Sequence, residues 1–196
     1  MSTKYTGKLF LIVGPSGVGK SVIVNLLREN YPDFIFPVTA TTRAPRPTEK
    51  NGVHYYFLTS AEFERRLKAG EFIEYAKIHG RDYYGILRES VVLPLEQGKI
   101  LIRDVDIQGA RTLHRDFDGK HLISIFLLPP SRKVLERRIR SRAPISDEEL
   151  AERLHSLELE VAGAKYCTHQ IQFGDEETIQ ECYQKVEKVI LQEISS

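Results

Sequence analysis

The fold is decided by the stretch Lys8-Leu9-Phe10-Leu11-Ile12-Val13-Gly14-Pro15-Ser16-Gly17-Val18-Gly19-Lys20-Ser21. It begins with a short, continuous apolar run that stops at a glycine, which is typical of a strand buried on both faces in a parallel sheet. Its second part fits the pattern G-x-x-x-x-G-K-[ST] at every fixed position. The residues that follow have the apolar spacing of a helix that ends near Asn30, ahead of Pro32. A strand, a glycine-rich loop and a helix therefore follow one another, as a phosphate-binding loop requires.

This loop is expected to hold the phosphates of a nucleoside triphosphate. Its glycines let successive backbone N–H groups point at an anion, and the next helix directs its positive end at the same spot. Lys20 supplies positive charge for the β- and γ-phosphates, and the hydroxyl of Ser21 is placed for Mg²⁺. The predicted ATP-binding residues are Gly14, Pro15, Ser16, Gly17, Val18, Gly19, Lys20 and Ser21. The alternative, a glycine-rich turn without a ligand, is disfavoured by the strand and helix on either side.

Composition limits what the loop is attached to. The 196 residues suffice for one compact domain, and 28 Lys+Arg nearly cancel 27 Asp+Glu, so no global field favours nucleic acid or an anionic membrane. Cys167 and Cys182 lack metal-ligand spacing and are interpreted as reduced thiols. Residues 1–8 lack the apolar segment of a signal peptide, and no run is long enough to span a bilayer. We expect a cytoplasmic protein without nucleic-acid or membrane partners.

Strands and helices alternate along most of the remaining chain. Further core strands are predicted at 100–106, 122–128 and 169–173, and helices at 59–69, 87–97, 132–142, 146–164 and 176–194. These lengths imply a mainly parallel sheet with right-handed crossovers. Residues 34–58 are instead β-prone and rich in proline, with Asn51-Gly52 as a hairpin signal, and residues 71–85 are extended and aromatic. The chain is predicted to be an α/β domain with a small β-rich insertion.

Two acidic residues, Asp104 and Asp106, end the second core strand. Ligands bind at the carboxyl ends of strands in open α/β sheets. We expect one acid to reach Mg²⁺, directly or through water, and the other to point at a bound substrate, because residues two apart share a strand face. The alternative is that one of them merely caps the helix that follows.

A second anion site is predicted in Thr41-Thr42-Arg43-Ala44-Pro45-Arg46-Pro47. Arg43 and Arg46, held by a turn stiffened by proline, can converge on one dianionic phosphate. Tyr55 and Tyr84 lie in nearby aromatic stretches, and each can add a hydroxyl hydrogen bond. The alternatives are surface arginines and core tyrosines.

These motifs together resemble those of the guanylate kinases. The resemblance runs from about residue 8 to about residue 153, and it rests on Thr41-Thr42-Arg43-x-Pro45-Arg46, Tyr55, Phe72-Ile73-Glu74, Tyr83-Tyr84-Gly85 and Asp104-Val105-Asp106-x-Gln108-Gly109. It implies a P-loop three-layer α/β/α fold with a central, mainly parallel sheet. The core would comprise about 1–36, 96–131 and 156–196, the acceptor-binding β-rich lobe about 37–95, and the helical lid about 132–155.

The resemblance also implies a reaction, namely Mg²⁺-dependent transfer of the γ-phosphoryl group of ATP to GMP, and also to dGMP, by a monomer or homodimer. It assigns GMP binding to Thr39, Arg43, Arg46, Tyr55, Glu74, Tyr84 and Asp106, and metal binding to Ser21 and Asp104. Within this set, Glu74 would accept hydrogen bonds from guanine N1–H and the exocyclic amine. A carboxylate offers two acceptors to these two donors and would meet the N1 acceptor of adenine poorly.

Arginines crowd the end of the helix predicted at 132–142. Alone, such a run is most often a solvated face, but beside a phosphate loop it can neutralise the transferring phosphoryl group. By resemblance, Arg138, Arg142 and Arg153 match lid and core arginines of the family, and the predicted catalytic residues are Lys20, Arg43, Arg138, Arg142 and Arg153. Closure of the lid over both nucleotides would exclude water.

The chain departs from the family pattern at four positions, Ile86, Arg103, Ala143 and Gly174. Ile86 stands where the family usually has a Ser or Thr hydroxyl against guanine, Gly174 near a usual adenine-contacting Asn, Ala143 at a common lid glycine, and Arg103 at a usually apolar strand position. Two alternatives therefore stay open. One is a related kinase with a shifted acceptor base, and the other is a non-catalytic interaction module of this type, which the intact phosphate loop disfavours.

Overall fold

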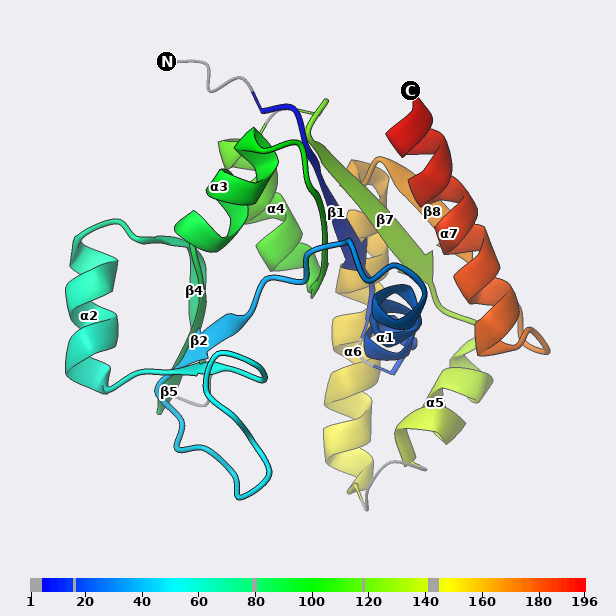
Figure 1. The fold of residues 1–196 in the computed structure, drawn as a ribbon. Coiled ribbons are helices and arrows are strands. Elements are labelled where there is room, and N and C mark those ends of the chain that lie inside the picture. The colour runs from blue at the N-terminus through cyan, green and yellow to red at the C-terminus, as the bar shows by residue number, and fades with distance from the viewer. Residues whose placement is uncertain (1–4, 16, 79–80, 118, 141–144) are drawn as a thin grey trace.

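A four-stranded parallel sheet forms the centre of the molecule (Figure 1). The computed structural model describes residues 5–15, 17–78, 81–117, 119–140 and 145–196. The strand order is β6-β1-β7-β8, with bounds of β1 (Lys8–Val13), β6 (Ile100–Val105), β7 (Leu122–Leu128) and β8 (His169–Gln172). β1 pairs in parallel with both β6 and β7, so the strand that leads into the phosphate loop is internal and buried. The predicted α/β class with a parallel central sheet is confirmed.

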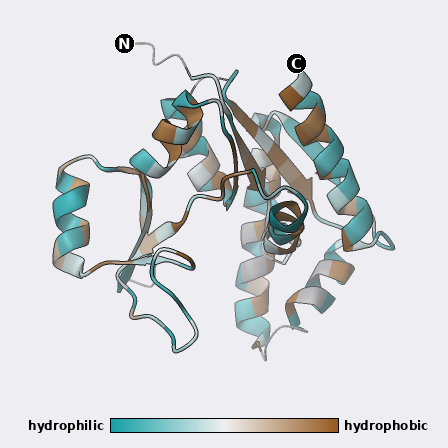
Figure 2. Ribbon diagram, viewed as in Figure 1, coloured by the Kyte–Doolittle hydropathy of each residue, from teal (hydrophilic) through white to brown (hydrophobic). Residues whose placement is uncertain are grey.

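Helices cover both faces of this sheet because the side chains of β1 alternate between two apolar clusters. Phe10 and Ile12 belong to the cluster with α1 (Lys20–Asn30) and α7 (Ile179–Ser195). Leu9, Leu11 and Val13 belong to the cluster with α3 and α4. The bounds on that second face are α3 (Glu89–Glu96) and α4 (Ile107–Asp116). Figure 2 shows the hydrophobic residues concentrated along the central strands, between the two helical layers.

A second, smaller sheet stands beside the first, in the order β3-β2-β5-β4 (Figure 1). Its elements are β2 (Thr39–Thr41), β3 (Tyr56–Phe57), β4 (Phe72–Ile78), β5 (Asp82–Leu87) and the covering helix α2 (Ser60–Lys68). Phe63 of α2 stacks on Phe72, with ring centroids 4.2 Å apart. This sheet is the predicted β-rich insertion.

The hairpin predicted at Asn51-Gly52 is wrong. β2 and β3 pair in parallel, so the segment between them must cross back to the start of β3. Asn51 serves this crossing, because its side-chain oxygen accepts a hydrogen bond from the N–H of Phe57 at 2.9 Å. Gly52, with φ of +76°, makes a turn within the loop instead of joining two antiparallel strands.

Two further helices, α5 (Arg132–Arg140) and α6 (Asp147–Gly163), extend beyond the carboxyl ends of the core strands (Figure 1). A small buried cluster of Ile139, Leu150 and Leu154 joins them. Ser146 caps α6 by accepting the N–H of Glu149, and the short helix η1 (Ala164–Tyr166) leads into β8. None of the helices in the described parts of the chain is both long and apolar enough to cross a membrane.

Three predicted boundaries move for identifiable reasons. The helix predicted from Leu87 begins at Glu89, because Leu87 still pairs with Phe72 as the last residue of β5. The strand predicted to end at Asp106 ends at Val105. The last helix begins at Ile179, after Thr178 and Glu181 form a capping box.

Candidate functional site

The phosphate loop connects β1 to α1 through glycines with positive φ, as its sequence predicts. Gly19, with φ of +112°, is the N-cap residue of α1, and a Cβ added there would lie 2.7 Å from Cδ1 of Ile179. Within the described parts of the chain no side chain caps this helix, and its first turn holds no acid. The positive end of the helix dipole therefore points at the loop, where it would favour a bound anion.

Lys20 is folded over this loop. Its ammonium group donates to the carbonyl oxygen of Pro15 at 3.1 Å, and it also donates to that of Gly14. Since these bonds are to the backbone of the loop itself, the charge already stands at the site where phosphates would bind. Ser16 lies outside the described residues.

The two predicted metal ligands meet. The hydroxyl of Ser21 donates to Oδ2 of Asp104 at 3.3 Å, although 83 residues separate them in sequence. The described residues contain no group of three His, Cys, Asp or Glu side chains able to hold a metal. Two hard oxygen donors beside a phosphate site fit Mg²⁺, which usually keeps water ligands and takes the rest from phosphates.

Asp106 has a role that the sequence offered only as the alternative. It is the N-cap residue of α4, where its Oδ1 accepts the N–H of Gly109 at 2.7 Å. The expectation that Asp104 and Asp106 share a strand face is wrong, because β6 ends before Asp106. Both acids still line one cavity of about 210 Å³, together with Thr39, Glu74, Tyr84 and Arg103.

The second anion site brings three of its four predicted side chains together. The guanidinium of Arg43 lies 5.3 Å from the ring centroid of Tyr55, and the rings of Tyr55 and Tyr84 are 6.1 Å apart, edge to face. Arg46 lies three residues further along the same loop with an exposed side chain. The geometry thus agrees with one basic, phenol-lined site.

Sequence reasoning missed Glu49, which occupies this site. Nη2 of Arg43 donates to both oxygens of Glu49, at 2.8 and 3.0 Å, and the backbone N–H of Arg46 donates to Oε2 at 2.7 Å. These hydrogen bonds from Arg43 lower the pKa of Glu49, and Glu49 in turn raises the pKa of Arg43 above its already high range. The acid therefore holds both arginine positions in one loop. In the sequence, the only indication of this contact is that Glu49 stands three residues after Arg46.

Glu74 lies at the inner end of the same lobe, opposite β6. Its Oε1 pairs with Nη2 of Arg103 at 2.8 Å, and Nη1 of Arg103 donates to the hydroxyl of Thr39 at 3.3 Å. Gly109 makes room for this carboxylate, because a Cβ there would stand 2.9 Å from Oε2 of Glu74. Arg103, for which the sequence suggested no role, therefore lines the same cavity as Glu74 and Thr39.

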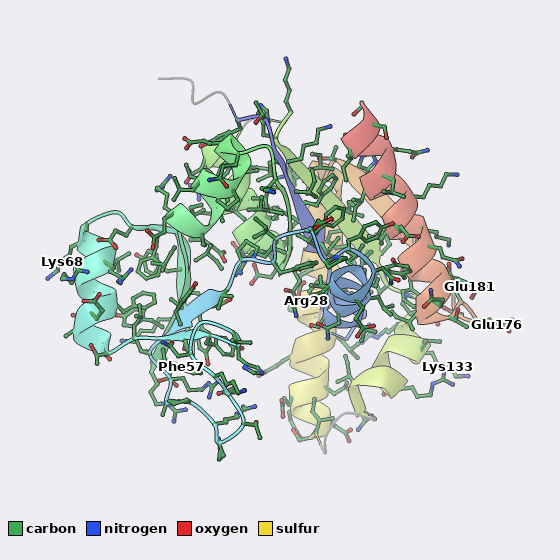
Figure 3. The ribbon with its side chains drawn as sticks, in the orientation of Figure 1. Arg28, Phe57, Lys68, Lys133, Glu176 and Glu181 are labelled. Carbon is green, nitrogen blue, oxygen red and sulfur yellow. The ribbon has the colours of Figure 1, made fainter. Side chains whose placement is uncertain are left out.

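A larger cavity of about 310 Å³ lies between α1 and the lobe. It is lined by Arg28 of α1, Tyr55 of the lobe and Asp104 of β6, among others. Figure 3 labels Arg28 on α1 and Phe57 in the lobe. This cavity shares Thr39, Arg103 and Asp104 with the smaller one, so the two cavities adjoin.

The family model described as guanylate kinase matches residues 6–193. The chain belongs to the guanylate kinase family. It is 43% identical to the guanylate kinase of Thermosynechococcus vestitus over 83% of this chain and 84% of that protein. It is 38% identical to that of Rickettsia bellii over 97% of each chain. A crystal structure of guanylate kinase from Anaplasma phagocytophilum matches with a TM-score of 0.73 and 28% identity, covering 98% of this chain and 89% of that one.

The arginines that this guanylate kinase family member was predicted to use in its lid remain predictions. Arg142 lies outside the described residues. Arg138 and Arg153 fall within α5 and α6, but their side chains are not described. Arg140, to which no role was assigned, pairs inside the lid with Asp147 at 2.6 Å and Glu136 at 3.4 Å.

Glu160 of α6 was not singled out in the sequence, yet it faces the site. Burial raises the pKa of its carboxyl, while the nearby charge of Lys20 lowers it and that of Asp106 raises it further. It lines a cavity of about 560 Å³ with Asp106, Gln108 and Arg111. This helix of the guanylate kinase fold thus brings an acid into electrostatic reach of both half-sites.

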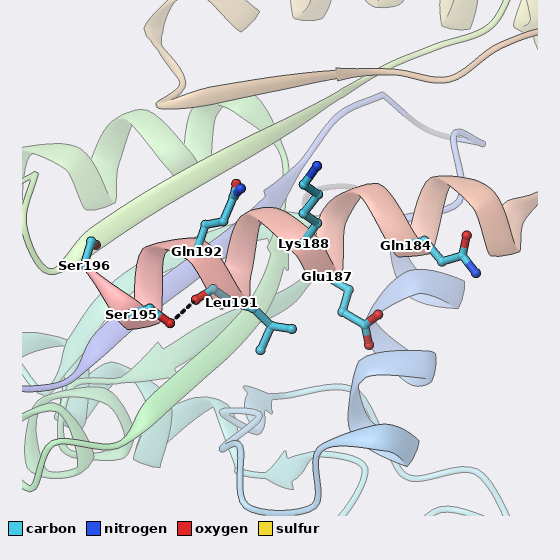
Figure 4. A pocket seen from close by; sticks show the side chains of 7 residues that line it. All are labelled: Gln184, Glu187, Lys188, Leu191, Gln192, Ser195 and Ser196. Carbon is cyan, nitrogen blue, oxygen red and sulfur yellow. Dashed lines mark hydrogen bonds between the residues drawn. The ribbon is translucent and has the colours of Figure 1, made fainter.

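A hollow of similar size, about 570 Å³, lies far from this chemistry along α7 (Figure 4). It is lined by polar side chains such as Gln184 and Lys188, and the hydroxyl of Ser195 donates to the carbonyl of Leu191 at 2.9 Å. None of the predicted site residues lines it. Size alone therefore does not identify the site, and the convergence of charged groups does.

Proposed function

We propose that the chain transfers the γ-phosphoryl group of ATP to GMP, and also to dGMP, in a Mg²⁺-dependent reaction that yields ADP and GDP. ATP-dependent phosphorylation of GMP follows from membership of the guanylate kinase family. The observation that carries the proposal is the contact of Ser21 in the phosphate loop with Asp104, an acid that lines one cavity with Glu74 and Tyr84. The inclusion of dGMP and of Mg²⁺ is our inference.

On the donor side, the loop from Gly14 to Ser21 would bind the triphosphate of ATP. Its backbone N–H groups and the N-terminus of α1 would hold the phosphates, and Lys20 would move from the loop carbonyls to the β- and γ-phosphates. Ser21 and Asp104 would hold Mg²⁺, which would neutralise the charge on the phosphates.

On the acceptor side, the 5′-phosphate of GMP would bind Arg43, Arg46, Tyr55 and Tyr84. Glu74 would accept from guanine N1–H and the exocyclic amine, with Thr39 and Asp106 as further contacts. The phosphate would compete with Glu49 for Arg43, so the acceptor site changes partners when it is filled.

Catalysis would be mainly positioning and charge neutralisation, because phosphoryl transfer requires little covalent help from the protein. We assign it to Lys20, Arg43 and the lid residues Arg138, Arg142 and Arg153. Lid closure would exclude water, which otherwise would receive the phosphoryl group. We propose the core, lobe and lid divisions given above and a cytoplasmic location. We also propose ATP and GMP as partners, without nucleic acid or membrane, and a monomer or homodimer.

A coupled assay of ADP formation across GMP, dGMP, AMP, CMP and UMP tests this function. We expect turnover with GMP and dGMP only, and loss of activity when EDTA removes the metal. Equal or better turnover of a base other than guanine would instead support the related kinase with a shifted acceptor preference. Retained GMP binding without any ATP-dependent turnover would support the non-catalytic module.

A further inference from the structure

Arg103 is largely enclosed at the junction of the two sheets. It belongs to β6 of the core, while its partners Glu74 and Thr39 belong to the lobe, and its side chain is only 14% exposed. A guanidinium in such a place is costly unless its N–H groups are paired. Two of its five N–H groups make these bonds. Its Nε is buried without a partner among the described residues.

A purely structural role does not account for this residue. Arg103 stands in the sequence Ile-Leu-Ile-Arg-Asp-Val, at a position where an apolar side chain would fill the space without a buried charge. Replacing a buried ion pair by apolar residues is often neutral or stabilising. An arginine left with an unsatisfied donor beside a cavity is therefore better explained by a ligand that takes part in the pairing.

The neighbouring residue Ile86 cannot donate a hydrogen bond to a ligand in this cavity. Ile86 lies opposite Thr39 on β2 and opposite Glu74 on β4, so the three side chains share one face of the lobe sheet. Its side chain is 1% exposed and belongs to the core cluster. The strand that lies between Thr39 and Glu74 therefore offers no polar side-chain group at this register.

The edge of guanine requires three partners in a row. The exocyclic amine and N1–H are donors that suit the carboxylate of Glu74, and O6 is an acceptor that requires a donor beside that carboxylate. Arg103 is the donor that the structure holds there, 2.8 Å from Oε1 of Glu74. Each carboxylate oxygen has two lone-pair sites, so the bond to Arg103 leaves room for guanine.

We propose that Arg103 is a specificity-determining residue, which orients Glu74 and donates an N–H group to O6 of the acceptor guanine. It thereby supplies the donor that Ile86 lacks. An adenine would place its amino group against the guanidinium, donor against donor, and would leave both groups unpaired. This inference rests on the proposed function.

The first test uses Arg103→Leu, which restores an apolar residue at this strand position. We expect kcat/KM for GMP to fall about 10- to 100-fold, mainly through KM, because one hydrogen bond to a charged group is lost. The acceptor 6-thio-GMP, whose sulfur accepts hydrogen bonds weakly, should lose much less on the same substitution. If kcat/KM falls equally for GMP and 6-thio-GMP, the proposed contact with O6 is wrong. Arg103 would then only hold the two sheets together.

A second substitution tests whether a polar group at position 86 can replace the hydrogen bond that Arg103 donates. Adding Ile86→Ser to Arg103→Leu should recover about tenfold of the lost kcat/KM for GMP, because a hydroxyl returns to the guanine edge. The proposal is contradicted if kcat/KM for GMP does not recover in a double variant whose melting temperature equals that of Arg103→Leu. If Arg103→Leu does not fold, Arg103→Lys replaces it, keeping the charge without the planar fork. The same preferential loss for GMP over 6-thio-GMP is then expected.

The matched control is Arg88→Leu. Arg88, which follows the last strand of the lobe, also forms an ion pair with an acid of the core, Asp116 at 3.7 Å. Unlike Arg103, it does not line the cavity that holds Glu74. Its kcat/KM for GMP should stay within about twofold of the wild type. Absence of GMP phosphorylation by the wild-type chain would refute the proposed function itself. If the wild-type chain phosphorylates GMP and Arg103→Leu does so equally well, only this inference is refuted.

Discussion

The donor half-site and the acceptor half-site are built in opposite ways. The donor site is a contiguous loop whose anion-binding groups are backbone N–H groups, fixed by glycines such as Gly19. The acceptor site is assembled from side chains between Thr39 and Asp106, drawn from two sheets. Its charges are already paired, Arg43 with Glu49 and Arg103 with Glu74. The proposed donor site is thus held by one contiguous loop, whereas the proposed acceptor site depends on side chains that already have acidic partners.

The largest expected effect comes from the donor site. Lys20→Ala should lower kcat about 10³-fold, because a fixed positive charge at the transferring phosphoryl group is lost. Affinity for GMP, measured by calorimetry without ATP, should be unchanged. The control is Lys188→Ala on the outer face of α7 (Figure 4), which should leave kcat unaltered. Weaker GMP binding by Lys20→Ala would show that the two half-sites are not separate.

Arg43→Gln should act on the acceptor instead. We expect KM for GMP to rise about 100-fold, since two charge-assisted hydrogen bonds to phosphate are lost, while KM for ATP changes little. Steady-state kinetics with each substrate varied in turn measure both constants. Arg65→Gln removes a similar ion pair on the exposed surface of α2 and is the control. A rise in KM for ATP of similar size would contradict the assignment of Arg43 to the acceptor.

Variants of Asp106 distinguish its role as a helix cap from its proposed contact with the nucleotide. Asn caps helices as well as Asp does, so Asp106→Asn should keep the stability of the wild type while KM for GMP rises about tenfold. Asp106→Ala should show the same rise in KM and also lose about 1 kcal/mol of unfolding free energy. Denaturant unfolding and kinetics measure the two effects. Unchanged KM in both variants would leave Asp106 as a cap only.

The smallest expected effect concerns Glu49. Glu49→Gln should lower KM for GMP by about fivefold, because the phosphate no longer competes with a charged Glu49 for Arg43. The ion pair lowers the pKa of Glu49 below its usual 4.5, so it stabilises the folded state above that value. This contribution is lost as the pH falls through the lowered pKa.

The difference in melting temperature between wild type and Glu49→Gln should therefore shrink between pH 7 and pH 3. Thermal unfolding followed by circular dichroism across this range measures it. A constant or widening difference would show that the pair with Arg43 does not stabilise the folded chain.

The sequence predicted the donor site well and the acceptor site less completely, for a physical reason. An apolar strand, positive-φ glycines and a helix are local features, so Lys8 to Asn30 could be placed from their own residues. The contact between Arg103 and Glu74 joins residues 29 apart through two different sheets, and no periodicity indicates it. The parallel pairing of β2 and β3 likewise overrides the turn preference of Asn51-Gly52. Asp106 looked like the end of a strand because the cap and the strand end are adjacent.

The most direct test of the account is a competition between acceptors. The chain, Mg²⁺ and ATP labelled in its γ-phosphate are mixed with equal concentrations of GMP and AMP, and the label in GDP and ADP is measured. Since the ratio of products equals the ratio of kcat/KM values, the account predicts label in GDP at least about 10³-fold above label in ADP. Comparable labelling of the two products, or label only in free phosphate, would contradict it.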